Sequence, residues 1–130
     1  MSQGRLQNRV AIITGGARGI GRAIALGLAA QGASVAFTDL AVDENTKSLE
    51  AEFSALGVKG KGYASNAASL EETKKVVADI LEDFGTVDVL VNNAGLALGL
   101  EMAHEASLED WETMVDTNIK GLLYMTRKVL

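Results

Sequence analysis

The sequence has 130 residues, enough for one domain with one hydrophobic core, and its 48% apolar and 22% charged residues exclude a disordered chain. The net charge of −5 argues against a nucleic-acid-binding surface, and the lack of cysteine excludes disulfides, thiolate catalysis and cysteine metal sites. The sequence contains neither a secretory signal nor an apolar run of roughly 20 residues, so we expect a cytoplasmic protein without membrane contact.

The first predicted elements are a strand and a helix. Residues 10–13 form a continuous apolar run, which is typical of a strand buried on both faces. Helical spacing follows over residues 19–32, and a glycine ends it. The apolar face of this helix is expected at Ile20, Ile24 and Leu28.

Two further strands are predicted at residues 34–38 and 59–64. The helix between them begins at Asp43 or Asn45, since both residue types cap helices, and ends at Gly57. Both strands are short and each follows a helix, which is the alternation expected of a parallel sheet.

The second half of the chain repeats this alternation. Ser69 and Glu72 match the capping box S-x-x-E, so they predict the start of a helix that ends at Gly85. Residues 87–91 predict a fourth strand, and a last helical region runs from Ser107 to the end. Strands that alternate with helices predict an α/β fold with right-handed crossovers and a parallel sheet.

The segment Thr14-Gly-Gly-Ala-Arg-Gly-Ile-Gly21 joins the first strand to the first helix. Glycines in such a loop let the backbone turn tightly and let a pyrophosphate approach the free amides of the helix N-terminus. Asp39 follows the second strand, where a carboxylate accepts both hydroxyls of an adenosine ribose and repels a 2′-phosphate. This favours NAD over NADP, whereas Arg18 favours NADP because it can pair with that phosphate. The alternative is a tight turn with a solvated Asp39.

These segments resemble the short-chain dehydrogenase/reductase family. The matching stretches are TGGARGIG at 14–21, FTDL at 37–40, VLVNNAG at 89–95 and Asn118 in TNIKG. The resemblance implies a Rossmann-type three-layer sandwich in which a sheet of about four parallel strands has the order 3-2-1-4. The second half resembles reductases of small hydroxy acids or amino-acid-like alcohols, and the first half resembles acyl-carrier-type ketoreductases, so the resemblance does not define a substrate class.

The resemblance also implies the roles of individual residues. Thr14 and Asn93 would tie the strand ends together, and Asn118 would position a water in a proton relay. Asn66 stands where the family usually has an aspartate that contacts the adenine amino group, and its carbonyl oxygen can accept the same hydrogen bond. The cofactor-binding residues implied are Gly15, Arg18, Gly19, Ile20, Gly21, Asp39, Asn66, Asn92, Ala94 and Gly95. No metal site is expected.

Tyr124 and Lys128 have the Y-x-x-x-K spacing of the family's catalytic pair. In the family that pair lies beyond a further strand with a serine, whereas Tyr124 follows Asn118 on the same predicted helix. We therefore interpret Tyr124 as a half-buried residue and Lys128 as a solvated one. The chain is expected to be a single truncated domain over residues 1–130 that keeps the cofactor half and does not transfer hydride alone.

Three functions remain open. The chain is an NAD-binding half-domain, a dehydrogenase completed by another chain or by Tyr124 and Lys128 after rearrangement, or a non-enzymatic fold or assembly fragment. His104 is interpreted as a surface residue because metal sites need several ligands. The fourth strand would be an apolar edge, which favours pairing with another chain. We expect a homo-oligomer through this edge or the last helix. The apolar residues of that helix expected to be underburied are Leu122, Leu123, Met125, Val129 and Leu130.

Overall fold

The computed structural model describes residues 4–95 and 107–130, except for the side chain of Trp111. His104 therefore lies outside the described residues. The elements in chain order are β1 Val10–Thr14, α1 Gly19–Ala30, β2 Ser34–Asp39, α2 Glu44–Ala55, β3 Gly60–Ala64, α3 Leu70–Phe84, β4 Val89–Val91, α4 Leu108–Val115, the π-helix η1 Asp116–Lys120 and α5 Gly121–Val129.

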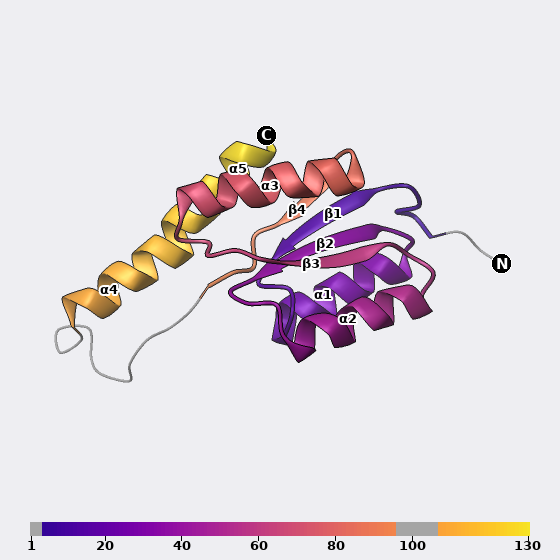
Figure 1. The fold of residues 1–130 in the computed structure, drawn as a ribbon, viewed down its shortest axis with the longest axis horizontal. Helices are drawn as coiled ribbons and strands as arrows, with labels where there is room; N and C mark the ends of the chain where they lie inside the picture. The colour runs from indigo at the N-terminus through magenta and orange to yellow at the C-terminus, as the bar shows by residue number, and fades with distance from the viewer. Residues whose placement is uncertain (1–3, 96–106) are drawn as a thin grey trace.

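The four strands form one parallel sheet in the order β3-β2-β1-β4, which confirms the predicted fold (Figure 1). β1 lies in the middle of the sheet, with Ile12 beside Ala36 on β2 and Leu90 on β4. All five residues of β1 are buried, because helices cover both faces. The carboxyl ends of β1, β2 and β4 therefore lie at one end of the sheet, where the predicted site residues follow.

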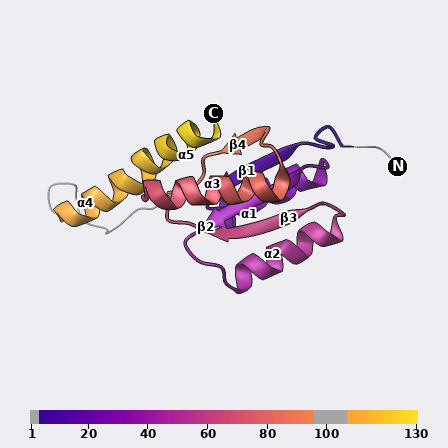
Figure 2. The same ribbon diagram turned by 45° about the horizontal axis from the view of Figure 1, so that its top comes forward.

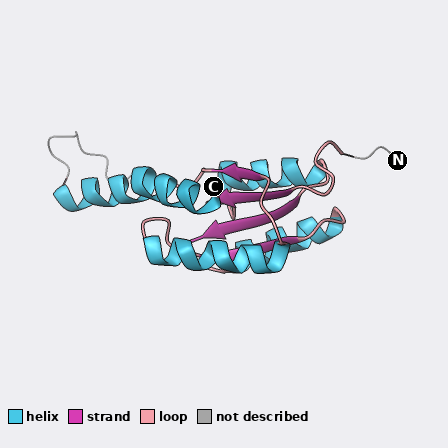
Figure 3. Ribbon diagram, turned by 90° about the horizontal axis from the view of Figure 1, so that it is seen from above, coloured by secondary structure: helices cyan, strands magenta, loops and turns pink. Residues whose placement is uncertain are grey.

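The helices form two outer layers. α1 and α2 cover one face of the sheet, where Ile13, Phe37 and Phe53 pack in one cluster. α3 and α5 cover the other face, where Ile12 and Ile80 pack in a second cluster. Turning the molecule shows the sheet between the layers and α4 extending beyond it (Figures 2 and 3). Successive strand residues point to opposite faces, so β1, β2 and β4 each contribute residues to both clusters.

The predicted apolar face of α1 was confirmed at Ile24 and Leu28, which pack against the core, but was wrong at Ile20. Ile20 is 74% exposed, whereas Gly21, Ala25 and Ala29 face the sheet. Small residues at these positions allow the helix axis to approach the strands closely, so size rather than hydrophobicity decided the packing. The exposed Ile20 then lies at the N-terminus of α1, next to the glycine loop.

The last helical region is continuous but changes its winding. Between α4 and α5 the backbone forms the π-helix η1, a local form that is often found at functional sites. Met125 on α5 is only 3% exposed and packs among Ile12, Tyr63 and Val76, so the expectation that it is underburied was wrong. Within the described ranges, no helix is long and apolar enough to cross a membrane.

Candidate functional site

The glycine loop turns sharply between β1 and α1. Gly15 has a φ of +66°, and a Cβ at this position would lie 3.0 Å from the Cα of Ala94 on the neighbouring strand end. At Gly21 a Cβ would collide with the carbonyl oxygen of Gly15 and approach Asn93 Nδ2 to 2.5 Å. Both positions therefore require glycine, which keeps the loop close to the end of β4.

The N-terminus of α1 is open to an anionic group. Arg18 is the N-cap in an extended conformation, no side chain caps the helix, and its first turn carries no acidic residue. A Cβ at Gly19 would meet no atom within 4 Å. Residues 18–20 are exposed, so solvent reaches this end of the helix, where the positive end of the helix dipole lies.

Asp39 ends β2 and faces this loop. Its Oδ2 accepts a hydrogen bond from the N–H of Ala17 (3.3 Å), and its Oδ1 accepts one from the N–H of Leu40 (2.9 Å). A carboxylate oxygen has two lone pairs, so both oxygens keep capacity for hydroxyl donors. Asp39 and the exposed Arg18 line one cleft with a volume of about 250 Å³.

This cleft brings together residues from five separate parts of the chain. The predicted cofactor residues among its lining are Gly15, Arg18, Asp39, Asn66, Ala94 and Gly95. Sequence analysis missed Leu40, Ala67 and Thr117, which line the same cleft. Leu40 and Ala67 directly follow predicted residues at strand ends, so position alone was a usable signal. Thr117 comes from η1, and its place at the cleft follows from tertiary packing.

Asn66 forms the wall beyond β3. Its Oδ1 accepts a hydrogen bond from the N–H of Ala68 (2.9 Å), and its own N–H donates to Glu72 Oε1 (3.1 Å). Glu72 thus bonds Asn66 rather than Ser69, so only the serine half of the predicted capping box forms. The Asn66 carbonyl oxygen retains a second lone pair toward the cleft.

The segment after β4 is tied to the end of β1. Thr14 Oγ1 accepts hydrogen bonds from the N–H groups of Asn93 (3.0 Å) and Ala94 (2.9 Å), and Asn93 Nδ2 donates to the carbonyl of Gly15 (3.0 Å). Thr14 and Asn93 therefore link the strand ends as expected. Asn92 differs, because its Nδ2 donates to Thr126 Oγ1 on α5 (3.0 Å).

Asn118 lies on η1 beside the same segment. A Cβ at Gly95 would be 3.1 Å from Asn118 Oδ1, so the two residues are neighbours although they are far apart in sequence. Tyr124 and Lys128 are on α5, and neither lines the cleft. The structure therefore places Asn118, and not the Y-x-x-x-K pair, next to the predicted cofactor residues.

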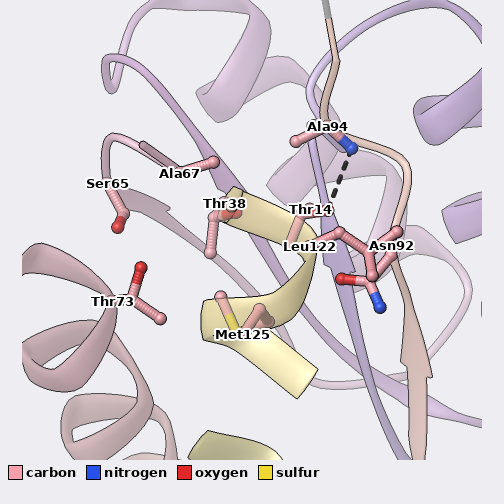
Figure 4. A pocket seen from close by; sticks show the side chains of 10 residues that line it. Thr14, Thr38, Ser65, Ala67, Thr73, Asn92, Ala94, Leu122 and Met125 are labelled. Atoms are coloured by element: carbon pink, nitrogen blue, oxygen red, sulfur yellow. Dashed lines mark hydrogen bonds between the residues drawn. The ribbon is translucent and has the colours of Figure 1, made fainter. Parts of the chain in front are cut away.

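A small cavity lies behind the cleft, between the strand ends and helices α3 and α5 (Figure 4). Its volume is about 10 Å³, close to what one water requires. Ser65 and Thr73 point their hydroxyls toward each other in it. Thr73 donates to the carbonyl of Ser69 (2.8 Å), whereas Ser65 Oγ has no hydrogen-bond partner among the described residues.

Open amides at α1, a carboxylate at the end of β2 and parallel strands ending at one cleft define a Rossmann-type nucleotide-binding protein. A family model described as short chain dehydrogenase matches residues 9–130. The chain belongs to the short-chain dehydrogenase family.

Individual relatives cover almost all of this chain. It is 44% identical over 121 residues to the NADP-dependent 3-hydroxy acid dehydrogenase YdfG of Salmonella typhi, which covers 93% of this chain and 47% of that protein. A short chain dehydrogenase from Burkholderia cenocepacia in complex with NADP matches with a TM-score of 0.91 and 34% identity, over 96% of this chain and 51% of that one. The 3-oxoacyl-[acyl-carrier protein] reductase from Brucella melitensis in complex with NAD matches with a TM-score of 0.88 and 37% identity, over 95% and 48%. The chain thus spans about half the length of these relatives.

Proposed function

We propose that residues 1–130 form a single dinucleotide-binding domain of an NAD(P)-dependent oxidoreductase, and that this domain prefers NAD. The observation that carries the preference is the carboxylate of Asp39, which two main-chain N–H groups hold at the cleft. A carboxylate accepts hydrogen bonds from the ribose hydroxyls of NAD, and its charge repels the 2′-phosphate of NADP.

Arg18 and two of the relatives support the opposite preference. Arg18 lines the same cleft, and a guanidinium pairs well with phosphate. The Salmonella relative is named NADP-dependent and the Burkholderia structure contains NADP, whereas the Brucella structure contains NAD. We favour NAD because Asp39 is fixed by the backbone, while Arg18 is an exposed side chain with many rotamers.

The residues present fit a dinucleotide. The amides near Gly19 and Ile20 would hold the pyrophosphate, since these residues are exposed and no side chain caps the helix. Asn66 would contact the adenine, and Ala94 and Gly95 would lie near the second ribose. When bound, the nicotinamide ring exchanges a hydride with substrate. The chain's own residues at that end orient the ring and, through Asn118, hold a water for proton transfer.

We further propose that these 130 residues do not transfer hydride alone. Tyr124 does not line the cleft, which supports this proposal. A second candidate is a dehydrogenase whose missing groups come from another chain or from Tyr124 and Lys128 after rearrangement, and a third is a fold or assembly fragment without catalysis. NAD reduction with a panel of alcohols that is lost in Tyr124→Phe would support the second candidate and contradict our proposal.

A homo-oligomer and a cytoplasmic location are proposed as well. The described part of α4, η1 and α5 exposes apolar side chains, and β4 is an edge strand of the sheet that the described residues form, so both surfaces suit contact with another copy. Neither nucleic acid nor membrane is proposed as a partner, given the net charge of −5.

The test is a calorimetric titration of the chain with NAD and with NADP, repeated with Asp39→Ala. We expect NAD to bind more tightly than NADP, and the substitution to flatten or reverse that order. Asp79→Ala is a matched control, because Asp79 lies on α3 and pairs with Lys75 away from the cleft (2.8 Å). Binding of neither dinucleotide would overturn the proposal, and tighter NADP binding would overturn the preference.

A further inference from the structure

Arg22 connects the glycine loop to the neighbouring helix. Its side chain is 22% exposed and makes hydrogen bonds with both ends of its guanidinium. Nη1 donates to the carbonyl oxygens of Ala17 and Asn45, both at 3.2 Å. Nη2 donates to Ser48 Oγ (3.0 Å) and Glu52 Oε2 (2.6 Å). One side chain of α1 thus bonds to the loop before it and to three residues of α2.

The contact with Ala17 matters because the opposite side of this residue is held by Asp39. The N–H of Ala17 donates to Asp39 Oδ2 (3.3 Å), while its carbonyl accepts from Arg22. Ala17 itself is 2% exposed, so its main chain has little room to shift. Asp39, Ala17 and Arg22 therefore form a continuous chain of hydrogen bonds from the cleft to α2.

Arginine is suited to this position. Its guanidinium is planar, stays charged at all accessible pH values and presents five donors in a fixed fork. It therefore bonds the loop and α2 at the same time, and its bonds to carbonyl and carboxylate oxygens are charge-assisted. A lysine would offer a single ammonium, which cannot keep the same spacing between Ala17 and Glu52.

We propose that Arg22 is a positioning residue for the adenosine end of the dinucleotide cleft. By holding Ala17, it fixes the position of the glycine loop relative to the carboxyl end of β2. This position in turn sets the orientation of the Asp39 carboxylate. Arg22 also fixes the main-chain position from which the side chain of Arg18, the residue after Ala17, extends. This inference rests on the proposed function and adds to it a residue outside the cleft that controls selectivity for the ribose.

The experiment compares NAD and NADP affinities of the wild-type chain and Arg22→Met by calorimetry, with thermal unfolding measured alongside. We expect the affinity for NAD to fall by about tenfold and that for NADP to fall less, so that the ratio of the two affinities shrinks. A merely structural role would lower the unfolding temperature and leave this ratio unchanged. The ratio of the two affinities in Arg22→Lys should lie between those of the wild-type chain and Arg22→Met. Arg22→Lys also supplies the comparison if Arg22→Met does not fold.

Lys61→Met is the matched control. It removes a cation that links two elements, since Lys61 on β3 pairs with Asp83 on α3 (2.8 Å), but it lies away from the glycine loop. Lys61→Met should lower the unfolding temperature and leave the ratio of the NAD and NADP affinities unchanged. A wild-type chain that binds neither dinucleotide overturns the proposed function together with this inference. A wild-type chain that binds, with an unchanged ratio in both Arg22 variants, overturns only the inference.

Discussion

At the scale of single residues, Ser65 has a buried hydroxyl that makes no hydrogen bond to the described part of the chain. It is 6% exposed, and its Oγ has no partner among the described residues. An unpaired buried hydroxyl lowers stability, so Ser65→Ala should leave the free energy of unfolding unchanged or raise it by up to about 1 kcal/mol.

Urea unfolding measures this change, and Thr73→Val is the control. Thr73 also buries its hydroxyl, but it donates to the carbonyl of Ser69, so its removal should cost about 1 kcal/mol. A larger loss in Ser65→Ala than in Thr73→Val would show that Ser65 has a stabilising partner.

Tyr63 should make stability fall in alkaline solution. Its hydroxyl donates to Asp83 Oδ2 (2.6 Å), and burial together with this bond raises the pKa of the phenol above its ordinary value of 10.0. The folded state therefore keeps the phenol proton to a higher pH than the unfolded state does. The stability from Tyr63 is complete below about pH 10 and decreases as the pH rises through the range between the two pKa values.

Urea midpoints measured from neutral pH to about pH 11 check this expectation. Tyr63→Phe should lose less of its stability than the wild-type chain above about pH 10, because it has no phenol to ionise. Equal slopes for both proteins would rule out Tyr63 as the titrating group.

Sequence reasoning about single residues succeeded where position depends on local structure. Asp39 lies at the cleft because it ends a strand, and the amides near Gly19 are open because a helix begins there. The direction of Asn92 could not be predicted, since its partner Thr126 lies on a helix placed by tertiary packing. The role of every predicted cofactor residue stays a prediction until binding is measured.

At the scale of elements, the strands and helices followed from apolar runs, caps and glycines. Their faces were harder to predict. α1 packs through Gly21, Ala25 and Ala29, which periodicity of large apolar residues does not indicate. The π-helix η1 was also missed, because the sequence pattern predicted one continuous helical region without a change of winding.

The N-terminus of α2 gives an element-scale prediction. Asp43 Oδ1 accepts hydrogen bonds from the N–H groups of Asn45 (2.9 Å) and Thr46 (3.3 Å), and Thr46 Oγ1 accepts one from the N–H of Asp43 (3.1 Å). The structure thus selects Asp43 over Asn45 as the cap. Asp43→Ala should cost about 1 kcal/mol of the free energy of unfolding.

Thermal and urea unfolding of Asp43→Ala and Asp43→Asn provide the measurement. Asparagine also caps helices, so the second variant should retain most of the stability. If both variants lose the same free energy of unfolding, Asp43 stabilises the helix through the interaction of its charge with the helix dipole and not through its hydrogen bonds.

At the scale of the whole molecule, the two edges of the sheet differ. On β3, Glu50 Oε2 accepts a hydrogen bond from the N–H of Gly62 (2.9 Å), and Lys61 adds a charge, so this edge discourages pairing. β4 pairs with β1 alone and consists of three apolar residues. Among the described strands, association is therefore favoured on the β4 side, where α5 also lies.

The surface of α4, η1 and α5 should join copies of the chain. Val115, Ile119, Leu122 and Leu123 are exposed along this continuous helical region, and we refer to these four residues as the apolar stripe. We expect sedimentation velocity to show a dimer or larger species that dissociates in Ile119→Glu and Leu123→Glu, because a buried unpaired carboxylate opposes association. Leu56→Glu is the control, since Leu56 is equally apolar and exposed but lies at the end of α2. A wild-type chain that stays monomeric at every concentration would mean that this stripe does not bind a second copy, and its apolar residues would then need a partner of a different kind.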